Sequence, residues 1–169
     1  FDKNMVIVYG DLLFRSHILR DLINSNGDIV VVIDSDQSQE INTGSPDFAY
    51  CSNEDDRSMF QQDITLDRIA TEKRRETKKP SGRWIGIIGV RGQGQKWITE
   101  ALSEIKKTDS YNQSSIPDLL NFLIEQGKKI NVHYIHGHWL FRQMYTHLSL
   151  FRSAPGNGHP PVFCAQGYF

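Results

Sequence analysis

The chain has 169 residues, of which 38% are hydrophobic and 23% are charged, a composition typical of one folded globular domain. Its 19 Lys and Arg residues nearly balance its 20 Asp and Glu residues, for a formal net charge of −1, so we expect no nucleic-acid partner. No apolar run is long enough for a transmembrane helix, so we expect no membrane partner either. The two cysteines, Cys51 and Cys164, cannot form a disulfide framework and suit a cytoplasmic location.

The chain begins at Phe1 and reaches strand-like sequence within a few residues, which predicts a piece of a longer protein. Residues 5–9, Met-Val-Ile-Val-Tyr, form an apolar run typical of a strand that is buried on both faces. The apolar residues that follow recur at roughly helical spacing: Leu12, Leu13, Leu19, Leu22 and Ile23. Residues 29–33 are a second apolar run, which ends on Asp34. Strand, helix and strand together predict a βαβ unit with a right-handed crossover.

Residues 35–82 are more polar and less regular, with candidate short strands over 48–51 and 64–66. Lys and Arg residues are dense in and next to the stretch 71–80: Arg68, Lys73, Arg74, Arg75, Lys78 and Lys79. This stretch is either a solvated connection or a patch that faces phosphate.

Residues 84–90, Trp-Ile-Gly-Ile-Ile-Gly-Val, predict another strand. The amphipathic helix expected after it has one face marked by Trp97, Ile98, Ala101, Leu102 and Ile105. A second helix begins near Ile116, with Pro117 in its first turn and Gly127 at the position of a left-handed cap. The predicted buried stripe of this helix consists of Leu119, Leu120, Leu123 and Ile124. Residues 130–135 return to a strand.

Two aspartates follow buried strands directly. Asp11 lies beside Gly10 after the first strand, and Asp34 ends the second. Ligand crevices in open α/β sheets lie outside the carboxyl ends of the strands. A carboxylate there is suited to hold Mg²⁺ and, through it, phosphate oxygens. The alternative for Asp11 is a helix N-cap.

Histidines crowd the end of the last predicted strand, where residues 133–139 read His-Tyr-Ile-His-Gly-His-Trp. Three interpretations stay open: a zinc site, ordinary loop histidines, or contacts with a substrate that bears phosphate. The glycines of residues 89–94 lack both the dinucleotide fingerprint and a P-loop, so a turn with positive φ explains them more simply.

Five segments resemble one family in order and spacing: residues 8–15, 30–34, 84–86, 116–121 and 134–140, the last reading Tyr-Ile-His-Gly-His-Trp-Leu. The chain resembles, from about residue 4 to 140, the nucleotidyltransferase module of phosphonate biosynthesis. The resemblance is close to 2-aminoethylphosphonate cytidylyltransferases, and this module is often fused behind a phosphoenolpyruvate phosphomutase.

The resemblance implies an α/β, Rossmann-like fold with a mostly parallel sheet, an antiparallel excursion over residues 35–90 and a missing N-terminal half. It also implies Mg²⁺-dependent transfer of a nucleotidyl group from CTP to a phosphonate such as 2-aminoethylphosphonate, with release of pyrophosphate. Asp11 is then a catalytic metal ligand, while Asn121, His138 and Trp139, with Asp34 as a weaker candidate, line the acceptor side.

The chain departs from the family in two ways. The glycine-rich nucleotide loop of the N-terminal half is absent, so residues 1–140 correspond to the C-terminal part of the domain and the exposed sheet edge predicts self-association. Relatives also follow the Gly-His-Trp-Leu run with an Asp that is the second metal ligand, whereas Phe141 and Gln143 stand here. We therefore expect the chain to be inactive alone.

The tail, residues 141–169, is rich in Pro and Gly and predicts irregular structure. A change of reading frame after Leu140 is our hypothesis for it, which translation of the parent nucleotide sequence in the other frames tests. Two other functions stay open: a nucleotidyltransferase for phosphocholine or a sugar 1-phosphate, and a non-catalytic nucleotide-binding or assembly module.

Overall fold

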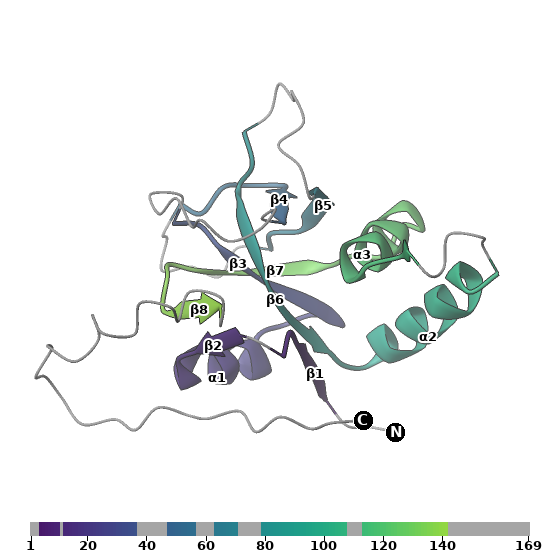
Figure 1. Cartoon of the computed structure of the whole chain (residues 1–169), viewed down its shortest axis with the longest axis horizontal. Helices are drawn as coiled ribbons and strands as arrows, with labels where there is room; N and C mark the ends of the chain where they lie inside the picture. The colour runs from purple at the N-terminus through teal and green to yellow at the C-terminus, as the bar shows by residue number, and fades with distance from the viewer. Residues whose placement is uncertain are drawn as a thin grey trace, which may run out of the picture.

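A six-stranded sheet runs through the structure, a computed structural model that describes residues 4–10, 12–36, 47–56, 63–70, 79–107 and 113–141 (Figure 1). Its strands are β1 (Met5–Val8), β3 (Ile29–Asp34), β4 (Phe48–Cys51), β5 (Leu66–Ala70), β6 (Gly82–Val90) and β7 (Asn131–Ile135). Two short strands, β2 (Leu12–Phe14) and β8 (Trp139–Phe141), form a separate ribbon. The helices are α1 (Ser16–Asn24), α2 (Gln93–Ile105) and α3 (Ile116–Glu125).

The strand order in the sheet is β5-β4-β6-β3-β7, and β1 also pairs with β6. Strands β3 and β7 are parallel, whereas β6 runs antiparallel to β1, β3 and β4. The predicted α/β class and the antiparallel excursion are confirmed. Among the described strands, however, most pairs are antiparallel, because β6 lies between β1 and β3 where the sequence predicted a simple βαβ unit.

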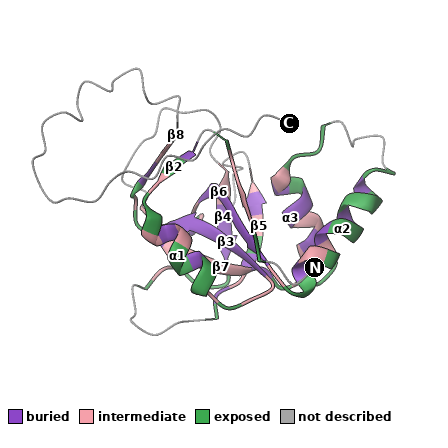
Figure 2. Ribbon diagram, turned by 90° about the horizontal axis from the view of Figure 1, so that it is seen from below, coloured by how far each residue is buried: buried purple, intermediate pink, exposed green. Residues whose placement is uncertain are grey.

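Helices cover both faces of the sheet, with α2 and α3 on one side and α1 on the other (Figure 2). The larger core cluster joins alternate residues of β3, such as Val31 and Ile33, to α2 and α3. The smaller cluster joins Val30 and Val32 to Ile18 and Leu22 of α1. Since successive strand residues point to opposite faces, the fully apolar β3 run supplies both cores. No helix of the described segments is both long and apolar enough to cross a membrane.

Helix α1 begins later than its apolar residues indicated. Its N-cap is Arg15, so the helix does not use an aspartate cap from the preceding turn. The residues it buries are Ile18 and Leu22, whereas Leu13 and Ile23, two of the apolar residues at helical spacing, are 40% and 45% exposed. The leucines before the helix belong to β2, which the periodic pattern did not separate from it.

The ends of α2 and α3 agree with the predicted signals. Ser115 and Asp118 form a capping box at the start of α3, and Pro117 lies in its first turn. Gly92, the N-cap of α2, and Gly127, after α3, both have positive φ. The prediction that Leu102 belongs to the apolar face of α2 is wrong, because this residue is 39% exposed.

Several predicted features lie outside the described residues: Asp11, Cys164, the basic segment 71–78 and the tail 142–169.

Candidate functional site

The site is centred on Asp34, the last residue of β3. Strand β3 is parallel to β7, and Asp34 pairs with Ile135 at the end of β7. The carboxyl ends of these two strands therefore lie side by side, which is where α/β sheets build ligand sites. Asp34 is only 4% exposed, so its carboxylate depends on protein donors in place of water.

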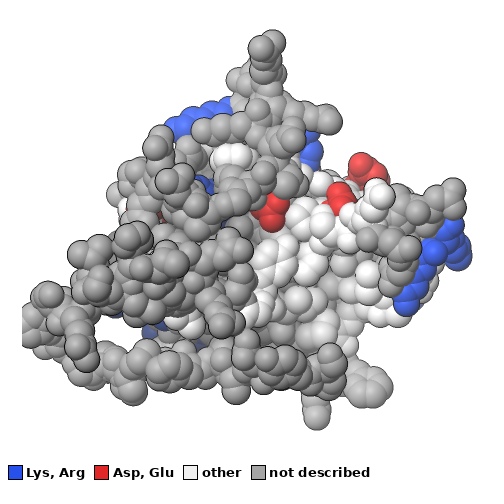
Figure 3. All heavy atoms as spheres, viewed as in Figure 1, with Lys and Arg blue, Asp and Glu red and all other residues white. Residues whose placement is uncertain are grey.

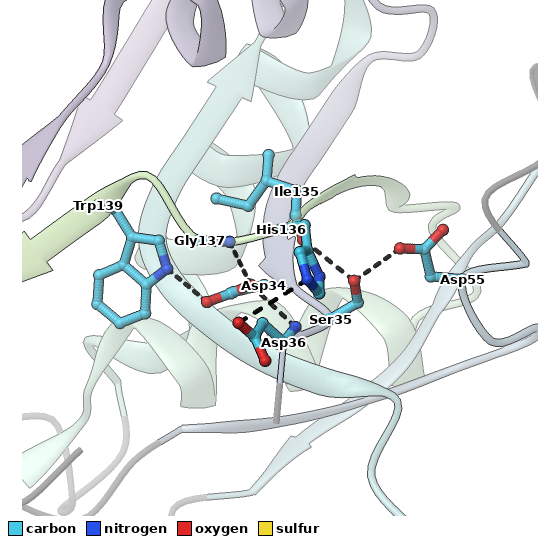
Figure 4. A network of polar contacts seen from close by, with 8 residues as sticks. All are labelled: Asp34, Ser35, Asp36, Asp55, Ile135, His136, Gly137 and Trp139. Atoms are coloured by element: carbon cyan, nitrogen blue, oxygen red, sulfur yellow. Dashed lines mark hydrogen bonds and ion pairs between the residues drawn. The ribbon is translucent and has the colours of Figure 1, made fainter. Parts of the chain in front are cut away.

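Three N–H groups of the described residues surround this carboxylate (Figure 4). The Trp139 indole Nε1 donates to Oδ2 at 2.6 Å, and the Gly137 backbone N donates to Oδ1 at 2.9 Å. The backbone N of Asp36 donates to the same Oδ1 at 3.0 Å. Hydrogen bonds to an ionised acceptor are roughly twice as strong as neutral ones. Asp34 thus ties the turn after β7 to the loop after β3.

The turn between β7 and β8 has an unusual backbone. Gly137 and His138 have φ angles of 70° and 67°, a conformation that non-glycine residues adopt at a cost of about 1–2 kcal/mol. The turn is fixed on both sides, because Asp34 accepts from Gly137 and the His138 carbonyl accepts from the Arg15 backbone N at 3.1 Å. The exposed His138 imidazole packs edge-on against His17, with ring centroids 5.4 Å apart.

The loop after β3 has its own anchors. The Ser35 hydroxyl donates to Asp55 at 2.6 Å and the Ser35 backbone N donates to the Ile135 carbonyl at 2.9 Å. The exposed His136 ring lies 3.9 Å from the Asp36 carboxylate. These partners come from distant parts of the chain, and no sequence signal singled out Ser35 or Asp55.

The histidines do not converge on one point. His133 lies across from Val32, on the α1 side of the sheet, where burial lowers its pKa below the usual value, Asp21 opposes this shift and His17 adds to it. His136, by contrast, faces Asp36. Within the described segments, no three His, Cys, Asp or Glu side chains are placed to hold a metal ion, so the zinc interpretation finds no support there.

Asn121, which the resemblance places on the acceptor side, binds the backbone of β5. Its side-chain oxygen accepts from the Ile69 N at 2.9 Å, and its Nδ2 donates to the Ile69 carbonyl at 2.8 Å. The structure therefore brings Asp34, His138 and Trp139 together, and it shows Asn121 joining α3 to β5.

The described residues do not fit a magnesium ion. Mg²⁺ prefers carboxylate oxygens, but those of Asp34 already accept the three N–H donors above. The register of the β2–β8 ribbon pairs Leu12 with position 141. Position 141 is thus close to the start of β2, yet it holds a phenylalanine, whose side chain has no oxygen.

Comparison with known proteins gives matches by structure but none by sequence. No family model matches the chain, and no curated protein matches its sequence. Solved structures do match. A protein named as a glucose-1-phosphate thymidylyltransferase from Bacillus anthracis superposes with a TM-score of 0.56 at 18% identity, over 93% of this chain and 58% of that one.

Two further structures agree. The inositol-1-phosphate CTP transferase of T. maritima has a TM-score of 0.57 at 12% identity, over 93% of this chain and 59% of its own. A nucleoside-diphosphate-sugar pyrophosphorylase from Vibrio cholerae RC9 has a TM-score of 0.52 at 15% identity, over 88% and 55%. The chain shares the fold of these three proteins. It spans 58%, 59% and 55% of the length of these three proteins.

Proposed function

We propose that this chain is the acceptor-side part of a nucleotidyltransferase that transfers a cytidylyl group from CTP to a phosphonate such as 2-aminoethylphosphonate. The observation that carries the proposal is the His-Gly-His-Trp turn, which Asp34 holds at the carboxyl ends of the parallel strands β3 and β7. The nucleotidyltransferase fold supports the reaction class.

The reaction is an in-line displacement. An oxygen of the phosphonate attacks the α-phosphorus of CTP, the bond from that phosphorus to the β-phosphate oxygen breaks, and pyrophosphate leaves with the bonding electrons. The protein has little covalent chemistry to do here, so it positions the reactants and offsets their charge. We assign the positioning of the turn to Asp34 and Trp139, and contact with the acceptor to the exposed His138 imidazole.

Asp11 stays the proposed magnesium ligand. Position 141 pairs with Leu12 in the β2–β8 ribbon. An aspartate at position 141 would therefore lie opposite the residue that follows Asp11 in the sequence. Because the side chain of Phe141 cannot replace a carboxylate as a metal ligand, we expect no measurable transfer by the chain as it stands.

The test joins this chain to the N-terminal half of a phosphonate cytidylyltransferase and measures pyrophosphate release from CTP and 2-aminoethylphosphonate with Mg²⁺. We expect release only in the Phe141→Asp variant, and its loss again when Asp11→Asn is added. A folded fusion that stays inactive with Phe141→Asp, on every acceptor tried, contradicts the proposal.

A sugar or inositol phosphate is the second candidate acceptor, because the solved structures above are named for such substrates. The same assay therefore includes glucose 1-phosphate, inositol 1-phosphate and phosphocholine beside the phosphonate. Faster release with one of these assigns the chain to that acceptor class. Titration calorimetry measures whether the chain binds CTP. Binding that does not need the metal, without release of pyrophosphate, favours a non-catalytic nucleotide-binding module.

A further inference from the structure

Three imidazoles from different parts of the chain meet near the start of α1, and we call His17, His133 and His138 the histidine cluster. His17 lies in the first turn of α1, and its ring packs edge-on against His138, with ring centroids 5.4 Å apart and an interplanar angle of 87°. His133 of β7 pairs with Val32 on the face of the sheet that α1 covers. His17 lowers the pKa of His133, as a second positive charge close by does. The cluster therefore joins α1, β7 and the turn after β7.

The start of α1 holds His138 at two points. The Arg15 backbone N donates to the His138 carbonyl at 3.1 Å, which fixes the left-handed backbone of this residue. The His17 ring contacts the imidazole itself. Within the described segments, no hydrogen bond or ion pair reaches that imidazole. Because aromatic pairs prefer an edge-on arrangement, the contact with His17 gives the exposed His138 ring one preferred orientation.

The charges around the cluster favour neutral imidazoles. Asp21 lies one helical turn after His17 on the same face of α1, and it opposes the lowering of the His133 pKa. The Asp21 carboxylate is shared, however, because it lies 3.8 Å from the Arg20 guanidinium. The exposed Arg15 adds another positive charge to this end of the helix. Protons added to the cluster therefore find little negative charge to offset them.

Acid should weaken the cluster for two physical reasons. Histidine side chains change their charge between about pH 5 and 8. Two neutral rings attract each other edge to face, whereas two imidazolium rings at the same distance repel. Burial also lowers the pKa of His133, so the unfolded chain binds the proton at that site more readily. The stability that neutral His133 contributes is thus lost as the pH falls from the usual histidine pKa toward the lowered one.

We propose that His17 is a positioning residue for His138, and that acid breaks their contact by charging the histidine cluster. At neutral pH the edge-on contact holds the imidazole that meets the acceptor. At acidic pH repulsion separates the two rings, while the hydrogen bonds of Asp34 and Arg15 keep the backbone of the turn in place. The positioning role rests on the proposed function, because it gives His138 an acceptor to contact. The acid-sensitive contact itself does not depend on that function.

The experiment follows the ring contact in the full chain by NMR on labelled histidines. Nuclear Overhauser effects between residues 17 and 138 are measured at about pH 7.5 and about pH 5.5, on either side of the usual histidine pKa. We expect the contact in the parent chain at the higher pH and its loss at the lower one. His17→Phe keeps an aromatic ring that cannot take up a proton, so it should keep the contact at both pH values. The urea midpoint of this variant should also fall less with acid than that of the parent.

The matched charge control is Lys96→Gln, which removes a positive charge from an exposed ion pair on α2. Helix α2 lies far from α1, on the other face of the sheet (Figure 2). Figure 3 shows Lys and Arg atoms at the right of the molecule, where Figure 1 places α2. We expect this variant to keep the ring contact and its loss in acid unchanged.

Circular dichroism establishes that each variant is folded. The acid-sensitive contact is overturned if the parent chain keeps it at the lower pH, or if His17→Phe loses it there as the parent does. An equal change of the acid response in Lys96→Gln also overturns it.

The positioning role is tested in the Phe141→Asp fusion at about pH 7.5. His17→Ala should raise the KM for the acceptor about two- to tenfold with little change in kcat, and His17→Phe should restore the KM. An unchanged KM in His17→Ala rejects the positioning role. Failure of the proposed function looks different: the contact in the chain alone is acid-sensitive, but the fusion releases no pyrophosphate.

Discussion

Asp34 combines near-complete burial with a full set of donors. An ionised carboxylate in such a place is tolerable only because charge-assisted hydrogen bonds replace its hydration. Its position at the end of a buried strand made it a candidate from the sequence alone. Its partners Gly137 and Trp139 follow 103 and 105 residues later, and no local pattern links residues that far apart.

We expect Asp34→Asn to lower the free energy of unfolding by about 1–3 kcal/mol. The amide replaces one acceptor oxygen with an NH₂ group, which then faces the N–H donors of Gly137 or Trp139. Trp139→Phe keeps most of the ring but leaves Oδ2 without its indole donor, so a loss of about 1 kcal/mol is expected. Urea unfolding followed by circular dichroism measures both changes.

The control for these variants is Glu100→Gln, which removes a charge from an exposed pair on α2 and should change stability by no more than about 0.5 kcal/mol. An Asp34→Asn chain as stable as the parent would mean that the three hydrogen bonds contribute little, and it would remove Asp34 as the positioning residue.

At the scale of elements, Asn121 takes the place of a missing strand. Strand β5 is the last in the main strand order, so one of its edges has no described strand beside it. The Asn121 side chain pairs there with both the N–H and the carbonyl of Ile69. Ile69 is only 2% exposed, so this pairing satisfies two buried backbone groups that no described strand reaches.

We expect Asn121→Ala to lower the free energy of unfolding by about 1–3 kcal/mol, because it leaves both backbone groups of Ile69 without this partner. Glu125→Ala, at an exposed position on the same helix, is the matched control and should have an effect below about 0.5 kcal/mol. Thermal and urea unfolding measure the difference. Unchanged stability together with weaker acceptor binding would instead support the acceptor-side role that the resemblance implies.

The elements themselves were largely predictable, but their partners were not. The apolar runs predicted β1, β3, β6 and β7, and helical spacing predicted the three helices, because both signals are local. Periodicity does not say which strands pair, so the insertion of β6 between β1 and β3 could not be read from it. The three-residue strands β2 and β8 are too short to have a period, and Leu12 was assigned to the helix for that reason.

Some residues of the candidate site could likewise be predicted from the sequence, and others could not. Position at the end of a strand identified Asp34, and the family resemblance identified His138 and Trp139, which the structure brings to the same turn. Other side chains share a face only through the strand between them: Arg68 pairs with Tyr50 and Arg83 with Phe48, both on β4, so no sequence pattern links the two arginines. Register of this kind is a property of the folded sheet.

At the scale of the whole molecule, β1 leaves one edge of the sheet open. Among the described strands it pairs with β6 alone, and Met5 is 39% exposed. An open, apolar strand edge favours pairing between copies. We expect the chain to self-associate as its concentration rises, and light scattering coupled to gel filtration measures this.

Met5→Lys should reduce the association, since a lysine on an edge strand opposes edge-to-edge pairing. Leu102→Lys on α2 is the control: its parent residue has the same 39% exposure but lies away from any strand edge, so it should leave the association unchanged. A chain that stays monomeric at all concentrations contradicts the expectation.

Strand β6 also decides when the molecule can form. It is the shared neighbour of β1, β3 and β4, yet it comes after all three in the sequence. Synthesis proceeds at about 5–20 residues per second, so β1 and β3 emerge several seconds before β6, the strand with which both pair. Contacts of such long sequence separation make folding slow. The nascent chain is thus most prone to aggregation just before residue 90 emerges. Chaperone binding, measured on nascent chains of increasing length, should be strongest at that length.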